Sequence, residues 1–272
     1  GRPYSLDNSL RSNISNFQTS GINAEELLIQ DANRVGPAPF RYGYRYETNI
    51  NMNTHGSWET LNNGDAIWRL QIESQDAFSI GLIYDNFYLP EGTTFYVYNQ
   101  NEVTILGGYT NDNNAEVFST PQIVGEVVFL EYYEPANTQG VPNISINTII
   151  HDYRGFYNMM GNTRDECGTN VVCAAADPYE DEINSAAHLD MGGYICSGGM
   201  LNNTSNDLTP YFLTANHCTQ GLNPSNFRFY FNYQTSSCNG SWANMGSYAY
   251  GSQMKWASND SNGGNGISEN DV

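Results

Sequence analysis

The sequence predicts an all-β fold with an antiparallel β-sandwich as its N-terminal domain. Between Phe40 and Phe156, short segments alternate apolar and polar residues with the period of a half-buried strand. Turn signals rich in Gly, Asn and Pro separate these segments, and no amphipathic helix interrupts them. Short strands at this spacing, without helices, are typical of two packed antiparallel sheets.

Four segments carry the strand prediction. In the clearest, Ala66–Glu73, every second residue from Ala66 is apolar. Glu126 falls on the apolar phase of another segment and is a flaw in its pattern. The other three segments are Phe78–Tyr84, Val124–Tyr132 and Ile144–Tyr153. Ahead of them, residues 1–35 are polar and irregular, apart from a short helix predicted over Asn23–Gln30.

Length and charge limit the class of protein. A chain of 272 residues is long enough for two domains, each with its own core. The formal net charge of −19 argues against nucleic acid or an anionic membrane surface as a partner. No apolar run approaches the ~20 residues that a membrane helix needs, so we expect no membrane insertion. Gly1 is interpreted as the start left after removal of a signal peptide.

Lysine is nearly absent from the chain. Lys255 is the only lysine among ten basic residues, although Lys is ordinarily one of the commoner residues. Two interpretations stay open. Either the surface is of an acidic type rich in Asn, Gly and Tyr, or the chain avoids cleavage at Lys.

All five cysteines lie between Cys167 and Cys238. This clustering favours a local disulfide framework in an oxidising compartment, and hence a secreted protein. A zinc site is the alternative, but there is no Cys-x-x-Cys pair and only His217 lies beside a Cys. Because five is odd, the count indicates a free thiol, an intermolecular bridge or a missing part of the chain.

The sandwich region shows no sign of chemistry. His55 lies in a Thr-His-Gly loop and His151 near a strand end, and both are interpreted as solvated or structural histidines. The many Tyr and Trp residues favour sheet packing over a sugar-binding platform. The segment Asn158–Glu166 breaks the strand pattern and is predicted to be a linker, with its one basic residue, Arg164, as a processing point.

Two predicted strands further along the chain carry the candidate catalytic residue. Tyr194–Thr204 and Pro210–Cys218 are joined by a polar turn, which brings Cys196 close to the register of Cys218. A disulfide between these cysteines would close a loop of about twenty residues and contribute roughly 3 kcal/mol in the chain-entropy model. It would also fix the turn that carries His217, and a catalytic base must be held within hydrogen-bond reach of the group that it deprotonates.

These residues resemble the trypsin-like serine peptidases. Thr214–Cys218 (Thr-Ala-Asn-His-Cys) is similar to their Thr/Ser-Ala-x-His-Cys signature, and Cys196–Gly199 is similar to the paired upstream strand. Within this class the chain is most similar to the bacterial lysyl endopeptidases, from Cys167–Cys173 through Tyr230–Gln234 to Cys238.

The resemblance implies a fold and a set of disulfides. The second domain would be most of the first β-barrel of a chymotrypsin-like fold, with the second barrel missing. The first would be a pro-region, because it is similar to those found ahead of such peptidases in gliding and related Gram-negative bacteria. The domains expected are therefore a sandwich over 1–157, a linker over 158–166 and an incomplete barrel over 167–272. The bridges implied are Cys196–Cys218, Cys173–Cys238, and one from Cys167 to a cysteine of the second barrel, beyond Val272.

In this family the triad occurs in the order His, Asp, Ser. By resemblance, His217 is the general base. Asp271 is assigned the orienting role, because Asn-Asp-apolar resembles the start of the family's Asp-bearing strand about 50 residues after the histidine. The alternative is an ordinary acidic residue at a chain end. No Gly-Asp-Ser-Gly-like element occurs, so the nucleophile is expected beyond Val272, and Ser197 on the histidine-supporting strand is not expected to serve.

Neither a metal nor an organic cofactor is expected. Asp260–Gly266 is similar to a calcium loop, but Gly264 stands where that motif needs an oxygen ligand, so a surface loop is favoured.

The sequence therefore predicts an extracellular serine endopeptidase in precursor form, either released or associated with the cell surface, whose substrates are proteins and peptides. Its 272 residues alone would be inactive without the C-terminal barrel of the same protein. Cleavage after Lys is a hypothesis from the resemblance and the scarcity of Lys, while Arg164 equally suits a pocket that accepts Arg. Two rivals stay open: a non-catalytic secreted protein that keeps a protease-like half as a binding or structural module, and a processed half of a complex.

Overall fold

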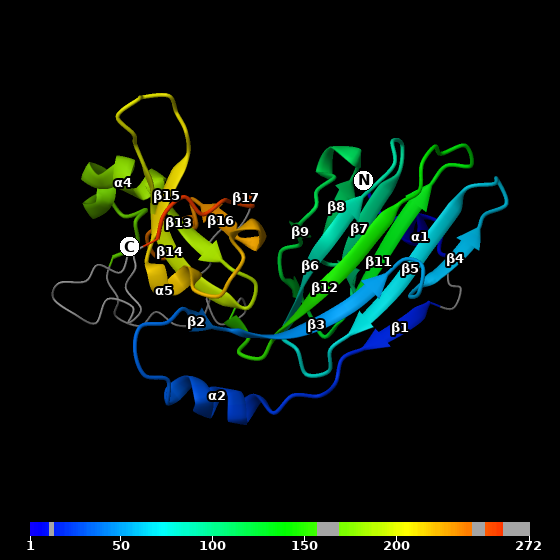
Figure 1. Cartoon of the computed structure of the whole chain (residues 1–272), viewed down its shortest axis with the longest axis horizontal. Helices are drawn as coiled ribbons and strands as arrows, with labels where there is room; N and C mark the ends of the chain where they lie inside the picture. The colour runs from blue at the N-terminus through cyan, green and yellow to red at the C-terminus, as the bar shows by residue number, and fades with distance from the viewer. Residues whose placement is uncertain (11–13, 157–168, 241–247, 258–272) are drawn as a thin grey trace. The chain divides into compact units, whose positions relative to one another are not determined.

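The chain folds into two compact units, each built from separate stretches of sequence. The first contains Gly1–Asn23 and Gly43–Gly155, and the second contains Ala24–Tyr42 and Phe156–Val272. The structure, a computed structural model, describes residues 1–10, 14–156, 169–240 and 248–257. Strands are the predominant secondary structure among these residues, which confirms the all-β prediction (Figure 1). Among them, no helix is both long enough and apolar enough to cross a membrane.

One stretch lies in a different unit from the one that the sequence predicts. Residues 24–42 were expected in the N-terminal sandwich, but they group with the second unit. The physical reason is a strand pairing, because residues 40–41 add to the sheet of the second unit rather than to either sheet of the first.

The first unit is a sandwich of two sheets. Its helices and strands are α1 (Tyr4–Asp7), β1 (Ser15–Gln18), β3 (Gly43–Asn51), β4 (Ser57–Thr60), β5 (Ala66–Glu73), β6 (Ser79–Tyr88), β7 (Thr94–Asn99), β8 (Ile105–Tyr109), the 3-10 helix η1 (Asn111–Asn113), β9 (Phe118–Ser119), β10 (Ile123–Val124), β11 (Val127–Glu134) and β12 (Asn143–Asp152). One sheet has the order β1-β5-β11-β7-β8 with β4 also on β5, and the other has the order β10-β6-β12-β3 with β9 also on β6.

The two sheets share one apolar core. Leu70 and Leu130 from the first sheet pack in the same buried cluster as Leu82 and Ile149 from the second. The prediction of an antiparallel sandwich needs one correction, because β1 pairs with β5 in parallel. The N-terminal residues were expected to be irregular, yet they supply both α1 and this edge strand.

Strand β5 has the predicted bounds, but both of its faces are largely buried. Trp68 on the apolar phase lies in the core, and Arg69 on the opposite face is only 3% exposed. The guanidinium of Arg69 donates to the carbonyl of Leu10 (3.1 Å) and to the carboxylate of Glu59 (3.1 Å). At Arg69 the polar phase of this strand is therefore covered by the N-terminal segment and β4, whereas Gln71 and Glu73 on the same phase are partly exposed.

The predicted strand Val124–Tyr132 is divided in the structure. Its first residues belong to β10, which pairs with β6, whereas the rest belongs to β11 in the other sheet. Gly125, with φ of +115°, stands at the crossing, and Glu126 follows it. The polar residue that broke the apolar phase thus marks the point at which the chain changes sheets.

His151 is a structural residue of the sandwich. It is 2% exposed on β12, and its Nδ1 lies 2.8 Å from the hydroxyl oxygen of Ser74, which is itself 2.9 Å from that of Thr19. Burial lowers the pKa of His151 from 6.5 to about 4, although the charge of Asp76 acts in the opposite direction. The imidazole is therefore neutral at physiological pH.

We predict that acid destabilises the sandwich through His151. The unfolded chain binds a proton at this residue near pH 6.5 and the folded chain only near pH 4, so stability is lost as pH falls through that window. Between pH 7 and pH 5 the loss should be about 2 kcal/mol. Urea unfolding of the wild type and of His151→Asn, compared at both pH values, isolates this contribution. An imidazole that titrates near pH 6.5 in the folded protein, as seen by NMR, would contradict the prediction.

Candidate active site

The second unit is built around one open antiparallel sheet. Its elements are α2 (Ala24–Ala32), β2 (Phe40–Arg41), η2 (Ala174–Tyr179), α4 (Glu180–Ser185), β13 (Ala186–Asp190), β14 (Tyr194–Leu201), β15 (Tyr211–Thr214), α5 (Asn216–Thr219), η3 (Pro224–Asn226), β16 (Arg228–Phe231) and β17 (Tyr248–Tyr250). The strand order is β15-β14-β13-β16-β17, with β2 also on β14. In the described residues the sheet does not close into a barrel.

An apolar cavity of about 540 Å³ lies on this sheet. It is lined by side chains of several strands, including Leu189 and Phe229, and by the following segment around Trp256. His217 does not line it. Leu189, Phe227 and Phe229 of the apolar cluster contribute to its lining, whereas much of the rest, including Leu201 and Tyr211, is exposed.

Strand β14 positions the candidate site. One edge pairs with β13 from Ile195 to Gly199. The other edge is shared between two partners, since Tyr194 and Ile195 pair with β2 and Gly198–Leu201 pair with β15. The short gap between these partners is Cys196 and Ser197, where the chain that leaves β15 turns back onto β14.

His217 lies on that turn. Strand β15 ends at Thr214, and the one-turn helix α5 begins at Asn216. The hydroxyl of Thr214 donates to the carbonyl of Ser197 (2.8 Å), and the amide of Cys218 donates to the carbonyl of Ala215 (3.0 Å). These bonds fix the backbone on both sides of the imidazole, which is itself half-buried.

A disulfide joins the same turn to β14. Cys196 and Cys218 are bonded, with their Cα atoms 6.2 Å apart, and Cys218 is 2% exposed. A ring nitrogen of His217 lies within 4.8 Å of both sulfur atoms. The predicted arrangement, a histidine beside a bridge that pins its turn, is therefore present.

A zinc site at this position was the alternative interpretation. Cys196, His217 and Cys218 do form the one group of potential metal ligands found among the described residues. The two sulfur atoms are bonded to each other in a disulfide, however, whereas zinc binds cysteine as the thiolate. The oxidised chain therefore lacks the thiolates that a zinc site at this position would need.

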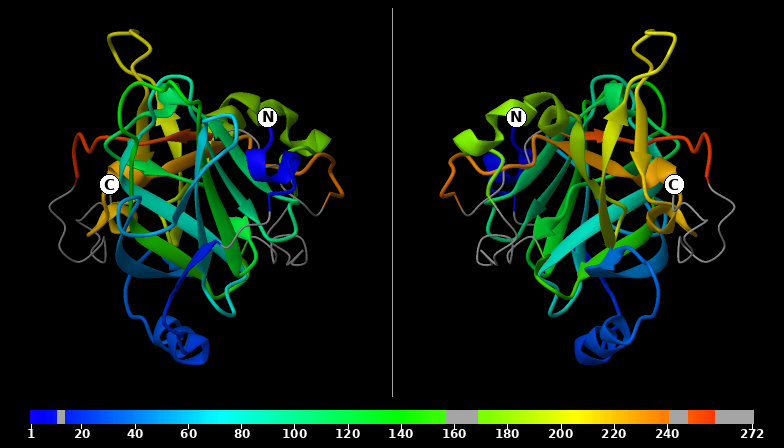
Figure 2. Two further views of the ribbon diagram at one scale, coloured as in Figure 1. Left: turned by 90° about the vertical axis from the view of Figure 1, so that its right-hand side faces the viewer. Right: turned by 90° about the vertical axis from the view of Figure 1, so that its left-hand side faces the viewer.

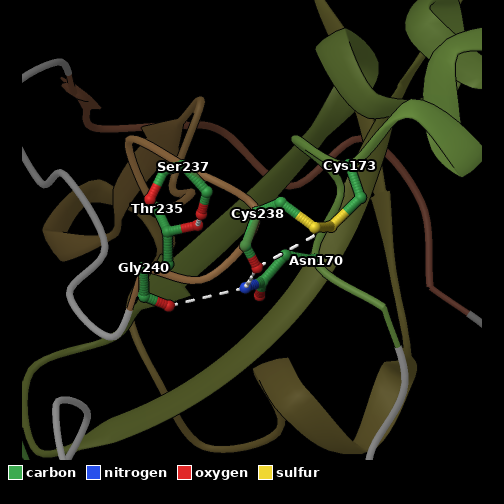
Figure 3. Close-up of a disulfide and its surroundings, with 6 residues drawn as sticks. All are labelled: Asn170, Cys173, Thr235, Ser237, Cys238 and Gly240. Carbon is green, nitrogen blue, oxygen red and sulfur yellow. Dashed lines mark hydrogen bonds between the residues drawn. A yellow bond between two sulfur atoms is a disulfide. The ribbon is translucent and has the colours of Figure 1, made fainter.

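The second disulfide closes the unit at a different point. Cys173 is bonded to Cys238, with Cα atoms 4.6 Å apart. Figure 3 shows how Asn170 supports it, because the side-chain amide donates to the carbonyl of Cys238 (2.8 Å). With the Cys196–Cys218 bond, these are the two intrachain pairs that the resemblance implied.

Other predicted site residues lie outside the described residues. They are Arg164, Cys167 and Asp271, together with the calcium-like segment Asp260–Gly266. Ser197 is described, and its side chain is exposed on β14 opposite His188 of β13.

His188 belongs to an aromatic cluster. Its ring stacks on Tyr233 (4.8 Å between centroids) and on Phe156 (6.0 Å). Burial lowers the pKa of His188, against the charge of Asp190. A neutral imidazole between aromatic rings is a packing residue.

Sequence reasoning missed the buried ion pair of this sheet. Asp190 (1% exposed) ends β13, and Arg228 (3% exposed) begins the adjacent β16, with 3.4 Å between Oδ2 and Nη1. The available signal was an acidic residue directly after Leu189 and a basic residue directly after Phe227, each at the edge of an apolar run. Buried charges of this kind need partners, so the two runs were candidates to lie side by side.

A one-turn helix that carries histidine at the end of a strand, with a disulfide to the neighbouring strand, fits the histidine-bearing half of a trypsin-like peptidase. Comparison with family models agrees with this class. Residues 161–263 match the model described as "Lysyl endopeptidase, C-terminal domain". Residues 161–263 are thus similar to a lysyl endopeptidase C-terminal domain, and the matched segment contains His217 and both disulfides.

We predict that Gly198 is required for this geometry and Gly199 is not. A Cβ at Gly198 would overlap the carbonyl oxygen of Leu213 and the ring of Phe212, whereas a Cβ at Gly199 meets nothing closer than 3.7 Å. Gly198→Ala should lower the free energy of unfolding of the second unit by about 1–3 kcal/mol. Gly199→Ala should change it by about 0.5 kcal/mol or less.

Hydrogen exchange of the β14 and β15 amides measures the difference. Faster exchange is expected in Gly198→Ala only. Equal exchange in the two variants would mean that the close approach of the strands does not constrain the site.

Proposed function

We propose that the chain is the precursor portion of a secreted serine endopeptidase, in which His217 acts as the general base. The observation that carries the proposal is the combination of the family match with a half-buried imidazole beside the Cys196–Cys218 bridge. A general base must be held within hydrogen-bond reach of the nucleophile, which requires a fixed backbone. Here two hydrogen bonds and one disulfide hold the turn that carries His217. Disulfides also favour an extracellular location.

The chemistry proposed is acyl transfer. His217 takes the proton of a serine hydroxyl as that oxygen attacks the scissile carbonyl, and then returns it to the leaving amine. Asp271 accepts a hydrogen bond from the other ring nitrogen, which fixes the tautomer and stabilises the imidazolium. The serine is proposed to lie downstream of Val272, in a second barrel of the same protein. Proteins and peptides are the proposed substrates, without a metal or an organic cofactor.

Substitution of His217 tests this role. The open reading frame, with all residues that follow Val272 in the gene, is expressed and assayed on peptide amides. His217→Gln should lower kcat/KM about 10⁴-fold, because the triad acts as a unit. Ser197→Ala and His55→Gln are the controls and should retain activity, since neither side chain has a place in the mechanism. Undiminished hydrolysis by His217→Gln, or loss of activity in Ser197→Ala, would contradict the assignment. A wild type without activity would instead favour a non-catalytic binding or structural role.

The sandwich is proposed to be a pro-region, removed by cleavage after Arg164. Preference for Lys at the cleaved bond is proposed from the family match and from the single Lys of the chain. These two proposals conflict if the enzyme processes itself, because Arg164 is not a lysine.

Processing and specificity can be measured together. The mature N-terminus should be Asp165 in the wild type, and Arg164→Gln should leave the precursor intact by mass spectrometry. Arg164→Lys should be processed at the same bond, and faster if a Lys-preferring enzyme acts on itself. A peptide-library digest that shows cuts mainly after residues other than Lys would remove the Lys preference.

A further inference from the structure

We infer that residues 24–42 bind the peptidase-like unit as a strand-forming anchor, and that they hold the N-terminal part of the chain on that unit after the chain is cut between the two. The inference concerns an interaction surface at the start of β14 and does not depend on any catalytic role of His217. Its occupant is the chain's own segment, which reaches the second unit ahead of most of the sandwich sequence.

The first contact of the anchor is the backbone pairing of β2 with β14. Phe40 and Arg41 of β2 lie opposite Ile195 and Tyr194 of β14, in antiparallel register. The amide of Tyr42 extends the ladder by donating to the carbonyl of Gly193 (3.0 Å). An extended segment that adds to an exposed sheet edge is a common mode of peptide recognition, in which main-chain bonds supply affinity and side chains supply specificity.

Tyr42 is the side chain that supplies specificity here. It is fully buried, and its hydroxyl donates to Oδ1 of Asp190 over 2.9 Å. The same carboxylate accepts from the amide of Gly192 (2.9 Å) and pairs with Arg228. A hydrogen bond to a buried carboxylate is stronger than one between neutral groups, and its loss leaves the charge less compensated. The phenol of the anchor therefore completes an electrostatic network that belongs to the peptidase-like unit.

Apolar contacts surround the phenol. The ring of Phe156 lies 5.8 Å from that of Tyr42 and 5.9 Å from that of Phe40. These pairs lie within the N-terminal piece left by a cut between residues 158 and 166, so they order the anchor. Across that cut, the ring of Phe156 stacks on His188 of β13 with 6.0 Å between centroids. The N-terminal piece therefore contacts the peptidase-like unit through the Tyr42 hydroxyl and the Phe156 ring.

The anchor is also ordered internally. Helix α2 projects from the sheet of its unit in Figures 1 and 2, but Arg41 links it to β2. The guanidinium donates to Oδ1 of Asp31 (2.7 Å) and to the carbonyl of Leu27 (3.3 Å). Because the strand carries its own helix, less conformational entropy has to be lost when it pairs with β14.

The chain path makes the anchor independent of the link between the units. The segment is covalently joined to the first unit at both of its ends, through residues 23 and 43. All five cysteines lie on the C-terminal side of residues 158–166, so no disulfide within the 272 residues can join β2 to β14. A cut within 158–166 therefore severs the covalent path between these strands and leaves the contacts described above intact.

A recognition sequence for a site-specific protease, introduced within residues 158–166 of the full chain, tests the inference. After cutting, the two pieces should co-elute in gel filtration at micromolar concentration. Amides of residues 40–42 should remain protected from hydrogen exchange. Separation of the wild-type pieces, or rapid exchange at 40–42 while they stay together, would overturn the inference.

Tyr42→Phe is the matched test of the side chain, because it removes one hydroxyl and keeps the ring. It should raise the dissociation constant of the cut pieces about 10- to 100-fold. The control is Tyr44→Phe, two residues further along, where the side chain is 37% exposed on the first unit. Equal dissociation constants for the two variants would exclude the phenol as the anchor. In Asp190→Asn, the Tyr42→Phe effect should shrink, as expected if the hydroxyl acts through that carboxylate.

Discussion

The hydrogen bonding of β14 along both of its edges is the constraint on which the candidate site depends. One edge is covered by β13, and the other is divided among β2, the Cys196–Cys218 bridge with the Thr214 hydroxyl, and β15. His217 lies where the chain leaves that edge. Its position is therefore determined by backbone bonds and a covalent bond, and only secondarily by side-chain packing. A glycine at 198 follows from the same constraint, because the two strands approach too closely for a Cβ.

The strands of the sandwich could be predicted where local pattern and tertiary environment agree. Ala66–Glu73 has the bounds that its alternation indicates. The alternation of apolar and polar residues was not sufficient where distant residues determine the environment of a side chain. Alternation cannot show that Arg69 is buried, since its partners Leu10 and Glu59 come from other segments. Nor does it show that β10 and β11 belong to different sheets, because the period is continuous across Gly125 and the φ angle there is not part of the pattern.

The candidate site was predictable to the extent that its parts are close in sequence. Cys196, His217 and Cys218 lie on two consecutive strands, so a turn and a register suffice to bring them together. Asp190, Arg228 and Tyr42 could not be found in this way. Asp190 and Arg228 come from β13 and β16, and Tyr42 follows β2, which lies between β1 and β3 of the sandwich in the sequence. No local feature of Phe40–Tyr42 distinguishes a strand of the second unit from one of the first.

The origin of β2 has a consequence for biosynthesis. Tyr42 and Asp190 are 148 residues apart in the chain. A ribosome that adds 5–20 residues per second would release β2 on the order of 10 s before β14 exists. During that interval most of the sandwich emerges, and the nascent Phe40–Tyr42 segment has no complementary edge from the second unit. Formation of the peptidase-like unit is thus a late, long-range step, and it is completed with a segment made before most of the sandwich.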